Sequence, residues 1–551
     1  MGAGLLAGGL ALGSLAAPPP VDPAQAQPMW SYRIVRGDTL IGVAATQLGP
    51  GAGWRPLQRL NRVANPRRLQ PGQVLRIPLA WLRVQPVRAE VLHVQGDVRV
   101  QRGGSAGSEV VAAGATLGSG DLLLAGPESA LALKFADGSR LLVRPDTQVR
   151  FERLVQIGAS GVPDTRLRLD SGSIDSHVQP AGAGRRYDIG TPSVNLGVRG
   201  TEFRTQVEPQ TRTTRVEVIE GSVAADNAAQ AGTPAAAIGA GFGTVVALGQ
   251  PVAAPRRLLD APDLGPVPAR LERVPLRLAW SPLAGASDYR AQVFPAEGVD
   301  AAGRLLLDGR FKEPGARWRD LPDGRYELRV RGVDAQGLEG RDARRSFVLK
   351  ARPEPPFTRQ PRADARLYGE PTRLAWTRAE GVASYRLQLA DSADFSAPRA
   401  DLAGLSGTEH DIALPPGSYH WRVASVRADG DAGPFGDAQA FTVRPVPPAP
   451  PLQPPRLSEA GVVLRWAAGE AGQTYALQVA RDAAFTDLVQ EQASAQPEAT
   501  LALPPPGRYY LRVRAVDADG QAGPWGGVQL IDVPQSRWWL LLPALLLLLV
   551  L

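Results

Sequence analysis

The sequence has 551 residues and a mass of 58.4 kDa, which is enough for about three to five domains. Hydrophobic residues make up 44% and charged residues 21%, with 60 glycines and 51 prolines. This composition excludes a disordered chain and favours short strands joined by many turns. The chain has no cysteine, which excludes disulfides, thiol nucleophiles and cysteine-based metal centres.

The net charge of +7 raises the question of a nucleic-acid partner. Only Lys134, Lys312 and Lys350 are lysines, and the other basic residues are arginines scattered through strand-like segments. Because they do not cluster into a patch, we do not expect nucleic acid as a partner.

Residues 1–26 are expected to be a secretory signal cleaved after Ala26. The first 17 residues are almost wholly apolar or small, and residues 24–26 give the small-x-small pattern of a cleavage site. A positive amino-terminal region is missing, since the first basic residue is Arg33. An uncleaved anchor is the alternative, but three consecutive prolines at 18–20 interrupt the apolar run.

Residues 30–79 predict a compact β-α-α-β block. Trp30–Val35 has strand character, and Asp38 or Thr39 is placed to cap a helix beginning near Leu40. A second short helix is expected over Trp54–Asn61 and a closing strand over Val74–Ile77. The run from Tyr32 to Leu40, the pairs 60–61 and 65–66, and the run from Leu69 to Pro78 resemble a LysM domain; the loop at 49–53 is longer than in that family.

The resemblance implies binding of glycans that contain N-acetylglucosamine, such as peptidoglycan, in a groove between two loops. The implied glycan-binding residues are Gly37, Asp38, Thr39, Leu40, Asn65, Pro66, Leu69 and Gln70. Turns rich in glycine and proline expose backbone groups that can pair with acetamido groups, while Leu40 and Leu69 would cover the apolar face of a sugar. In the alternative interpretation, Asp38 and Thr39 only cap the helix and Leu40 only packs.

Residues 88–225 predict an all-β domain, because apolar residues alternate in many short segments, as in Leu131–Phe135 and Leu141–Val143 around a turn at Asp137-Gly138. The stretches 118–121, 135–139, 169–173, 190–192, 197–203 and 220–223 resemble the FecR domain, an extracytoplasmic β-rich module. The family's sensors carry a cytoplasmic anti-sigma segment and a membrane helix before this domain, whereas here a signal segment and the LysM-like block precede it. Residues 226–268 are rich in alanine, glycine and proline and are expected to be a linker, with one more strand at Ala237–Leu248.

Residues 269–533 contain an internal repeat of about 90 residues. Trp280, Trp376 and Trp466 recur at this spacing, as do Tyr289, Tyr385 and Tyr475. Units of this length with short strands predict three β-sandwiches, at 269–350, 357–444 and 456–533, joined by proline-rich junctions. They resemble fibronectin type III domains, and we expect the tryptophans to lie in their cores.

Residues 537–551 are expected to seat the chain in a membrane. Trp538–Leu551 contains no charged residue. Its 14 residues would form a helix of about 21 Å, against a hydrocarbon core near 30 Å. The alternative is a strand or helix packed into the last sandwich.

Two short patterns resemble catalytic motifs but lack the surrounding structure that catalysis requires. Gly103–Gly107 satisfies G-x-S-x-G, but it lies in a Gly/Ser loop between β segments, where a nucleophile elbow needs a strand before and a helix after. Asp175, Ser176 and His177 are consecutive. Because neighbouring residues on a strand point to opposite faces, these three side chains are not expected to form a catalytic triad. We therefore expect no catalytic residue, no metal and no cofactor.

The fold class expected is a multidomain, mainly β protein with one small β-α-α-β domain and a short hydrophobic end segment. The expected function is that of an exported, non-enzymatic protein of the bacterial cell envelope or periplasm. It would bind peptidoglycan, contact a membrane through its end and hold an unidentified protein partner. The alternatives are an envelope-signal receptor of the FecR type and, third, an enzyme that modifies the wall.

Overall fold

The computed structural model describes residues 29–158, 161–180, 185–228, 235–297, 303–369, 371–458 and 460–535. The expected signal segment 1–26 and the expected membrane tail 537–551 lie outside these residues. The chain divides into two compact units, the first ending at Lys350 and the second beginning at Ala351. In the part of the chain that is described, no helix is long and apolar enough to cross a membrane.

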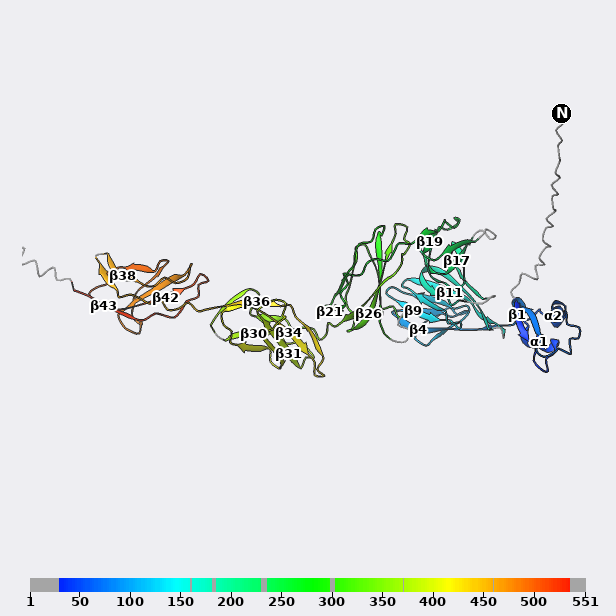
Figure 1. The fold of residues 1–551 in the computed structure, drawn as a ribbon, viewed down its shortest axis with the longest axis horizontal. Helices are drawn as coiled ribbons and strands as arrows, with labels where there is room; N and C mark the ends of the chain where they lie inside the picture. The colour runs from blue at the N-terminus through cyan, green and yellow to red at the C-terminus, as the bar shows by residue number, and fades with distance from the viewer. Residues whose placement is uncertain are drawn as a thin grey trace, which may run out of the picture. The chain divides into compact units, whose positions relative to one another are not determined.

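The LysM-like block, residues 29–82, has the predicted order β-α-α-β (Figure 1). Its elements are β1 Met29–Arg33, α1 Leu40–Gln47, α2 Trp54–Asn61 and β2 Val74–Pro78, followed by a short 3-10 turn at Leu79–Trp81. Strands β1 and β2 are antiparallel, and Thr39 caps α1 by accepting a hydrogen bond from the Gly42 N–H at 3.0 Å. Leu40, Leu57 and Ile77 are fully buried and form the centre of its core.

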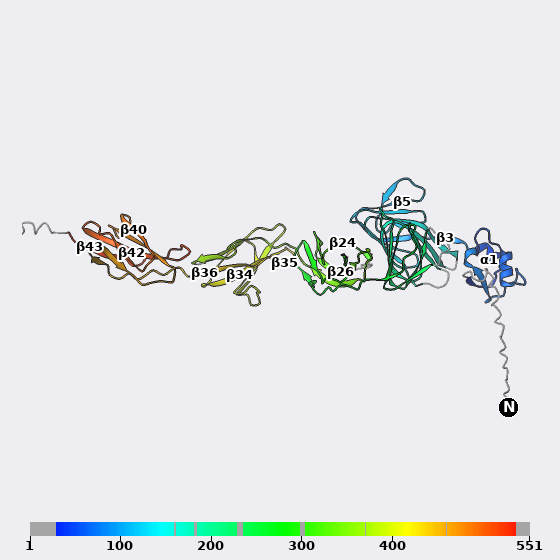
Figure 2. The same cartoon turned by 90° about the horizontal axis from the view of Figure 1, so that it is seen from above.

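The FecR-like domain, residues 84–257, consists of strands that pair into one closed system (Figures 1 and 2). The strands are β3 Val84–Pro86, β4 Ala89–Gln95, β5 Val98–Gln101, β6 Ser108–Val110, β7 Thr116–Leu117, β8 Leu122–Ala125, β9 Ala130–Lys134, β10 Arg140–Val143, β11 Thr147–Ile157, β12 Val162–His177, β13 Arg186–Gly190, β14 Val194–Val198, β15 Glu202–Val207, β16 Thr214–Glu220, β17 Ser222–Asn227, β18 Ala236–Gly239, β19 Phe242–Val246 and β20 Arg256–Arg257. Their inward residues, Phe151 and Phe203 among them, form a single apolar core.

The expected linker at 226–268 is wrong in its first half, where the one strand expected at Ala237–Leu248 is found as two strands, β18 and β19. Strand β18 pairs with β17, and β19 pairs with β16 and β20, so the FecR-like domain continues past residue 225. The physical reason is burial, because Ile238 and Val246 are fully covered within the domain core. The small residues around Ile238 and Val246 give this segment the composition of a linker, which is why the sequence suggested one.

The LysM-like block packs against the FecR-like domain. Ile157, at the end of β11, belongs to the apolar core of the block. The Arg83 guanidinium donates to the carbonyls of Ala45 and Leu48, at 2.8 and 3.3 Å. The junction after β2 is therefore fixed by both apolar and polar contacts.

Three β-sandwiches follow, as the repeat predicts. Sandwich 1 contains β21 Arg270–Leu271, β22 Leu276–Ala279, β23 Asp288–Pro295, β24 Leu307–Phe311, β25 Gly315–Trp318, β26 Gly324–Val333 and β27 Ala343–Leu349. Sandwich 2 contains β28 Thr358–Gln360, β29 Ala365–Tyr368, β30 Thr372–Trp376, β31 Ser384–Ala390, β32 Ala400–Leu405, β33 Glu409–Ile412, β34 Gly417–Val426, β35 Ala432–Phe435 and β36 Gln439–Arg444. Sandwich 3 contains β37 Arg456–Ser458, β38 Gly461–Arg465, β39 Thr474–Ala480, β40 Leu488–Ser494, β41 Glu498–Leu501, β42 Gly507–Val516 and β43 Gln529–Val533.

The repeated tryptophans lie in the sandwich cores, which confirms the prediction. Trp280, Trp376 and Trp466 are 3%, 1% and 4% exposed. Each packs edge-on against the repeated tyrosine of its own sandwich, with ring centres 5.1 to 5.7 Å apart. A second repeated tyrosine, Tyr326, Tyr419 or Tyr509, donates its hydroxyl to a proline carbonyl four residues earlier at 2.7 Å.

Candidate functional site

Two loops of the LysM-like block lie side by side and bring the expected glycan-binding residues together. The Leu40 N–H donates to the Pro66 carbonyl at 2.8 Å, which joins the loop after β1 to the loop before β2. The Gly72 N–H donates to the Ile34 carbonyl and the Ile34 N–H to the Gln73 carbonyl, both at 2.8 Å. These backbone bonds fix the spacing of the two loops.

Asp38 and Thr39 are engaged in holding the first loop. The Asp38 carboxylate accepts hydrogen bonds from the Tyr32 hydroxyl at 2.8 Å and from the Val35 N–H at 2.9 Å. Burial and the Asp38 carboxylate together raise the pKa of Tyr32. Because the Thr39 hydroxyl caps α1, both side chains shape the loop, and the backbone of Gly37 remains on its surface.

The expectation that Leu40 covers a sugar is wrong. Its side chain is 0% exposed, because residue 40 opens α1 on the face that packs into the core. The apolar groups that do reach the surface of this loop are its neighbours, with Val35 57% and Ile41 42% exposed. Sequence reasoning missed Ile41, although its place next to a core-facing helical residue is the signal that would have found it.

The second loop offers more accessible groups. The Asn65 side-chain oxygen accepts from the Arg67 N–H at 3.0 Å, and Leu69 is half-buried against the core. Gln70 is exposed, and its side-chain amide has no hydrogen-bond partner among the described residues. The loop pair therefore presents backbone groups, one free amide and apolar side chains.

The LysM-like block has a strongly basic composition. Asp38 is the single carboxylate residue of positions 29–82, against eight arginines. Glycoside hydrolysis generally uses a pair of carboxylates, which this block does not contain. Its arginine excess instead suits a ligand that carries negative charge.

The glycines of the FecR-like motifs have structural roles. Gly200 has a φ of +62°, and a Cβ there would lie 2.8 Å from the Cα of Pro180. Gly221 has a φ of +82°, and its Cβ would lie 2.6 Å from the Gly200 carbonyl oxygen. Both glycines lie too close to neighbouring backbone to accommodate a side chain.

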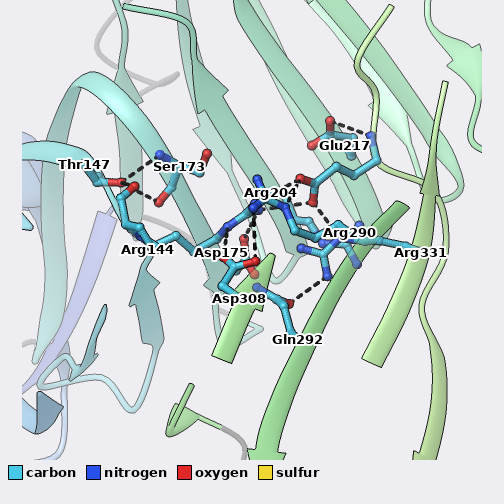
Figure 3. A network of polar contacts seen from close by, with 12 residues as sticks. Arg144, Thr147, Ser173, Asp175, Arg204, Glu217, Arg290, Gln292, Asp308 and Arg331 are labelled. Atoms are coloured by element: carbon cyan, nitrogen blue, oxygen red, sulfur yellow. Dashed lines mark hydrogen bonds and ion pairs between the residues drawn. The ribbon is translucent and has the colours of Figure 1, made fainter. Parts of the chain in front are cut away.

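A buried polar network joins the FecR-like domain to sandwich 1 (Figure 3). Arg144, which follows β10, binds Glu339 of sandwich 1 through both terminal nitrogens, at 3.1 and 3.0 Å. Arg331 also binds Glu339, at 2.5 Å, and donates to the Gln292 side-chain oxygen at 2.9 Å. Arg204 of the FecR-like domain reaches across to Asp342 at 2.8 Å.

The pKa values of two acids in this network are shifted in opposite directions. Burial, together with the neighbouring Glu339 carboxylate, raises the pKa of Glu217 to about 8. Burial also disfavours charge on Glu339, but Arg144, Arg331 and Arg290 outweigh it and hold the pKa of Glu339 well below its usual range. Burial thus favours the protonated form of Glu217, whereas the arginines favour the ionised form of Glu339.

Two family models match this chain. The LysM domain model matches residues 32–78, and the FecR protein model matches residues 121–224. The chain thus carries a LysM domain followed by a FecR domain, two domain types that are typical of bacterial envelope proteins. No curated protein matches the chain.

Several solved structures are similar to parts of it. They include a proposed anti-sigma factor from Parabacteroides distasonis, with 12% identity and a TM-score of 0.21, covering 25% of this chain and 59% of that one. The FN1–FN3 domains of chicken CNTN1 share 18% identity at a TM-score of 0.24, covering 50% of this chain and 100% of that one. The fibronectin(III)-like modules of Clostridium thermocellum CbhA share 16% identity at a TM-score of 0.22, covering 33% and 94%. The chain thus spans about three fifths of the first of these structures.

Proposed function

We propose that this chain is an exported, non-enzymatic protein of the bacterial envelope that binds peptidoglycan through its LysM domain. The observation that carries the proposal is the loop pair around the Leu40–Pro66 hydrogen bond, within the stretch that the LysM model matches. The arginine excess of the block suits a wall polymer that bears carboxylates.

The remaining modules would then act as a scaffold or tether. The contact between Ile157 and the LysM core supports a firm connection between glycan binding and the FecR domain. The three sandwiches bury their repeated aromatic residues, which suits spacers better than sugar platforms. Residues 1–26 as a cleaved signal and residues 537–551 as a membrane seat complete the proposal, and a protein partner would bind the sandwiches.

The variant Ile41→Asp tests whether the Ile41 side chain contacts the bound glycan. An aspartate in the first turn of α1 is compatible with the helix, because negative charge there interacts favourably with the helix dipole. The apolar contact to the sugar is lost, so we expect binding to N-acetylglucosamine oligomers, measured by calorimetry, to weaken roughly tenfold, about 1.4 kcal/mol. Val110→Asp, at a 67% exposed site of the FecR-like domain, is the matched control. Equal binding by Ile41→Asp and the wild type would show that Ile41 does not contact the glycan.

A second candidate function is that of an envelope-signal receptor. The FecR model match at 121–224 favours it. A sigma factor or sensor kinase encoded beside this chain, whose target genes change when the chain is deleted, would support this candidate over the scaffold.

The absence of enzymatic activity is part of the proposal. We expect no clearing of peptidoglycan by the purified protein in a zymogram. A cleared band at its mass would instead indicate an enzyme that modifies the wall.

A further inference from the structure

A cavity lies between the FecR-like domain and sandwich 1, beside the buried network. It has a volume of about 460 Å³, within the usual range of small-molecule sites. Its walls come from β4, β9, β10, β12, β15 and β16 on one side and from β23, β26 and β27 on the other. Boundaries between domains are common places for ligand sites.

Basic side chains stand next to one another on the sandwich wall of this cavity. Arg329 and Arg344 are directly opposite in the register of β26 and β27, and both line the cavity. Arg329 is compensated by Glu327 at 2.5 Å and by the Phe294 ring, whereas Arg344 makes no ion pair with another described residue. Like charges directly opposite each other destabilise a sheet unless something binds between them.

The FecR-like wall also carries basic side chains. Arg140 is opposite His177 in the register of β10 and β12. In total the cavity is lined by five arginines and three carboxylate residues. All three acids have basic neighbours, since Asp342 pairs with Arg204 and Arg331, Asp175 pairs with Arg144, and Glu202 lies 3.9 Å from His177. The lining therefore has an excess of positive charge.

Unsatisfied donors mark the same place. Gln292 and Arg331 line the cavity and are each 1% exposed. The Gln292 Nε2 and one terminal nitrogen of Arg331, Nη2, have no hydrogen-bond partner among the described residues. Buried donors are normally hydrogen-bonded to an acceptor. The Gln292 side-chain oxygen already accepts from the other terminal nitrogen of Arg331 (Figure 3).

Ser176, Gln179 and Glu202 also line the cavity, beside apolar side chains. Leu92, Ala132, Leu142 and Ile219 contribute to the walls. We propose that this cavity binds a small anion that carries a carboxylate or phosphate group beside an apolar part. The guanidinium groups would bind the anionic group, and the leucine and isoleucine side chains would cover the rest.

The test is calorimetric titration of the full chain with two probes, glutarate for the carboxylate and phenyl phosphate for the phosphate. We expect at least one of them to bind with a Kd of about 1 mM or tighter. Binding of glutarate alone would assign the site to carboxylates, and binding of phenyl phosphate alone would assign it to phosphates. If neither probe binds at roughly ten times that concentration, the proposal is overturned.

Two variants then locate the binding. Ile219→Trp fills the cavity and is expected to abolish binding, and Arg344→Gln is expected to weaken it roughly tenfold. Arg277→Gln removes an exposed arginine from the same sandwich outside the cavity and should bind as wild type does. If Ile219→Trp does not fold, as judged by near-ultraviolet circular dichroism, Arg344→Gln decides. Wild-type affinity in Arg344→Gln would place the bound anion elsewhere and contradict the proposal.

Discussion

At the scale of single residues, Glu217 is the most buried acid in the part of the chain that the structure describes. It is 1% exposed, and its side-chain Oε1 accepts a hydrogen bond from the Glu339 N–H at 3.2 Å. Glu339, Arg204 and Arg144 are the charged groups that face it, and burial is the largest influence on its pKa. Glu217 therefore keeps its proton in the folded protein over a range of pH where an unfolded chain releases it.

This difference predicts a dependence of stability on pH. The pKa of Glu217 rises from 4.5 to about 8 on folding. Its contribution to the free energy of unfolding is therefore fully present below pH 4.5 and is lost as the pH rises toward 8. Each pH unit in that range costs up to about 1.4 kcal/mol. Glu217→Gln cannot ionise, so relative to wild type it should gain stability between pH 5 and about 8 in urea unfolding. Glu220→Gln, at an exposed site of the same strand, should track wild type, and a pH-independent difference for Glu217→Gln would refute the assignment.

Trp466 gives the second prediction at this scale. It is 4% exposed and packs on Tyr475 at 5.1 Å, so Trp466→Ala empties a large core site. We expect a loss of about 3–5 kcal/mol in the stability of sandwich 3. Hydrogen exchange should accelerate in β39 and β42 and remain unchanged in the LysM domain, because separate domains have separate cores. Leu503→Ala, at a 54% exposed position, is the control. Unchanged exchange in Trp466→Ala would show that this tryptophan is not a core residue.

At the scale of elements, the turn between β26 and β27 carries the contact that joins sandwich 1 to the FecR-like domain. Glu339 in this turn binds Arg144, Arg290 and Arg331. An ion pair that is well formed and buried gains little over apolar packing, but removing one partner leaves an uncompensated charge. The network therefore determines which surface of sandwich 1 contacts the FecR-like domain.

Arg144→Met tests this contact. The change leaves Asp308 and Glu339 with one guanidinium fewer, and we expect about 3–5 kcal/mol of destabilisation in denaturant unfolding of the unit ending at Lys350. Arg310→Gln breaks a half-exposed pair with Asp288 and should cost no more than about 1 kcal/mol. Equal effects of the two changes would mean that the buried network contributes nothing beyond a surface pair.

At the scale of the whole molecule, the sequence predicted the order of domains well. The β-α-α-β block follows from helix caps and apolar spacing, and the sandwiches follow from the recurrence of Trp280, Trp376 and Trp466. The cavity and its network were not predictable, because Arg144 and Glu339 are 195 residues apart and their strands have no special composition. The side of α1 on which Leu40 lies depended on packing against Leu57 and Ile77, which periodicity over 8 residues does not fix.

The central claim is that the LysM domain attaches this chain to peptidoglycan. Co-sedimentation with purified sacculi tests it directly, comparing the full chain with the same chain lacking residues 29–79. The full chain should pellet with sacculi and be released by N-acetylglucosamine oligomers, with an affinity no better than roughly micromolar, about −8 kcal/mol. The shortened chain should stay in the supernatant. If the shortened chain pellets as the full chain does, the attachment lies in another domain, and the proposed function is contradicted.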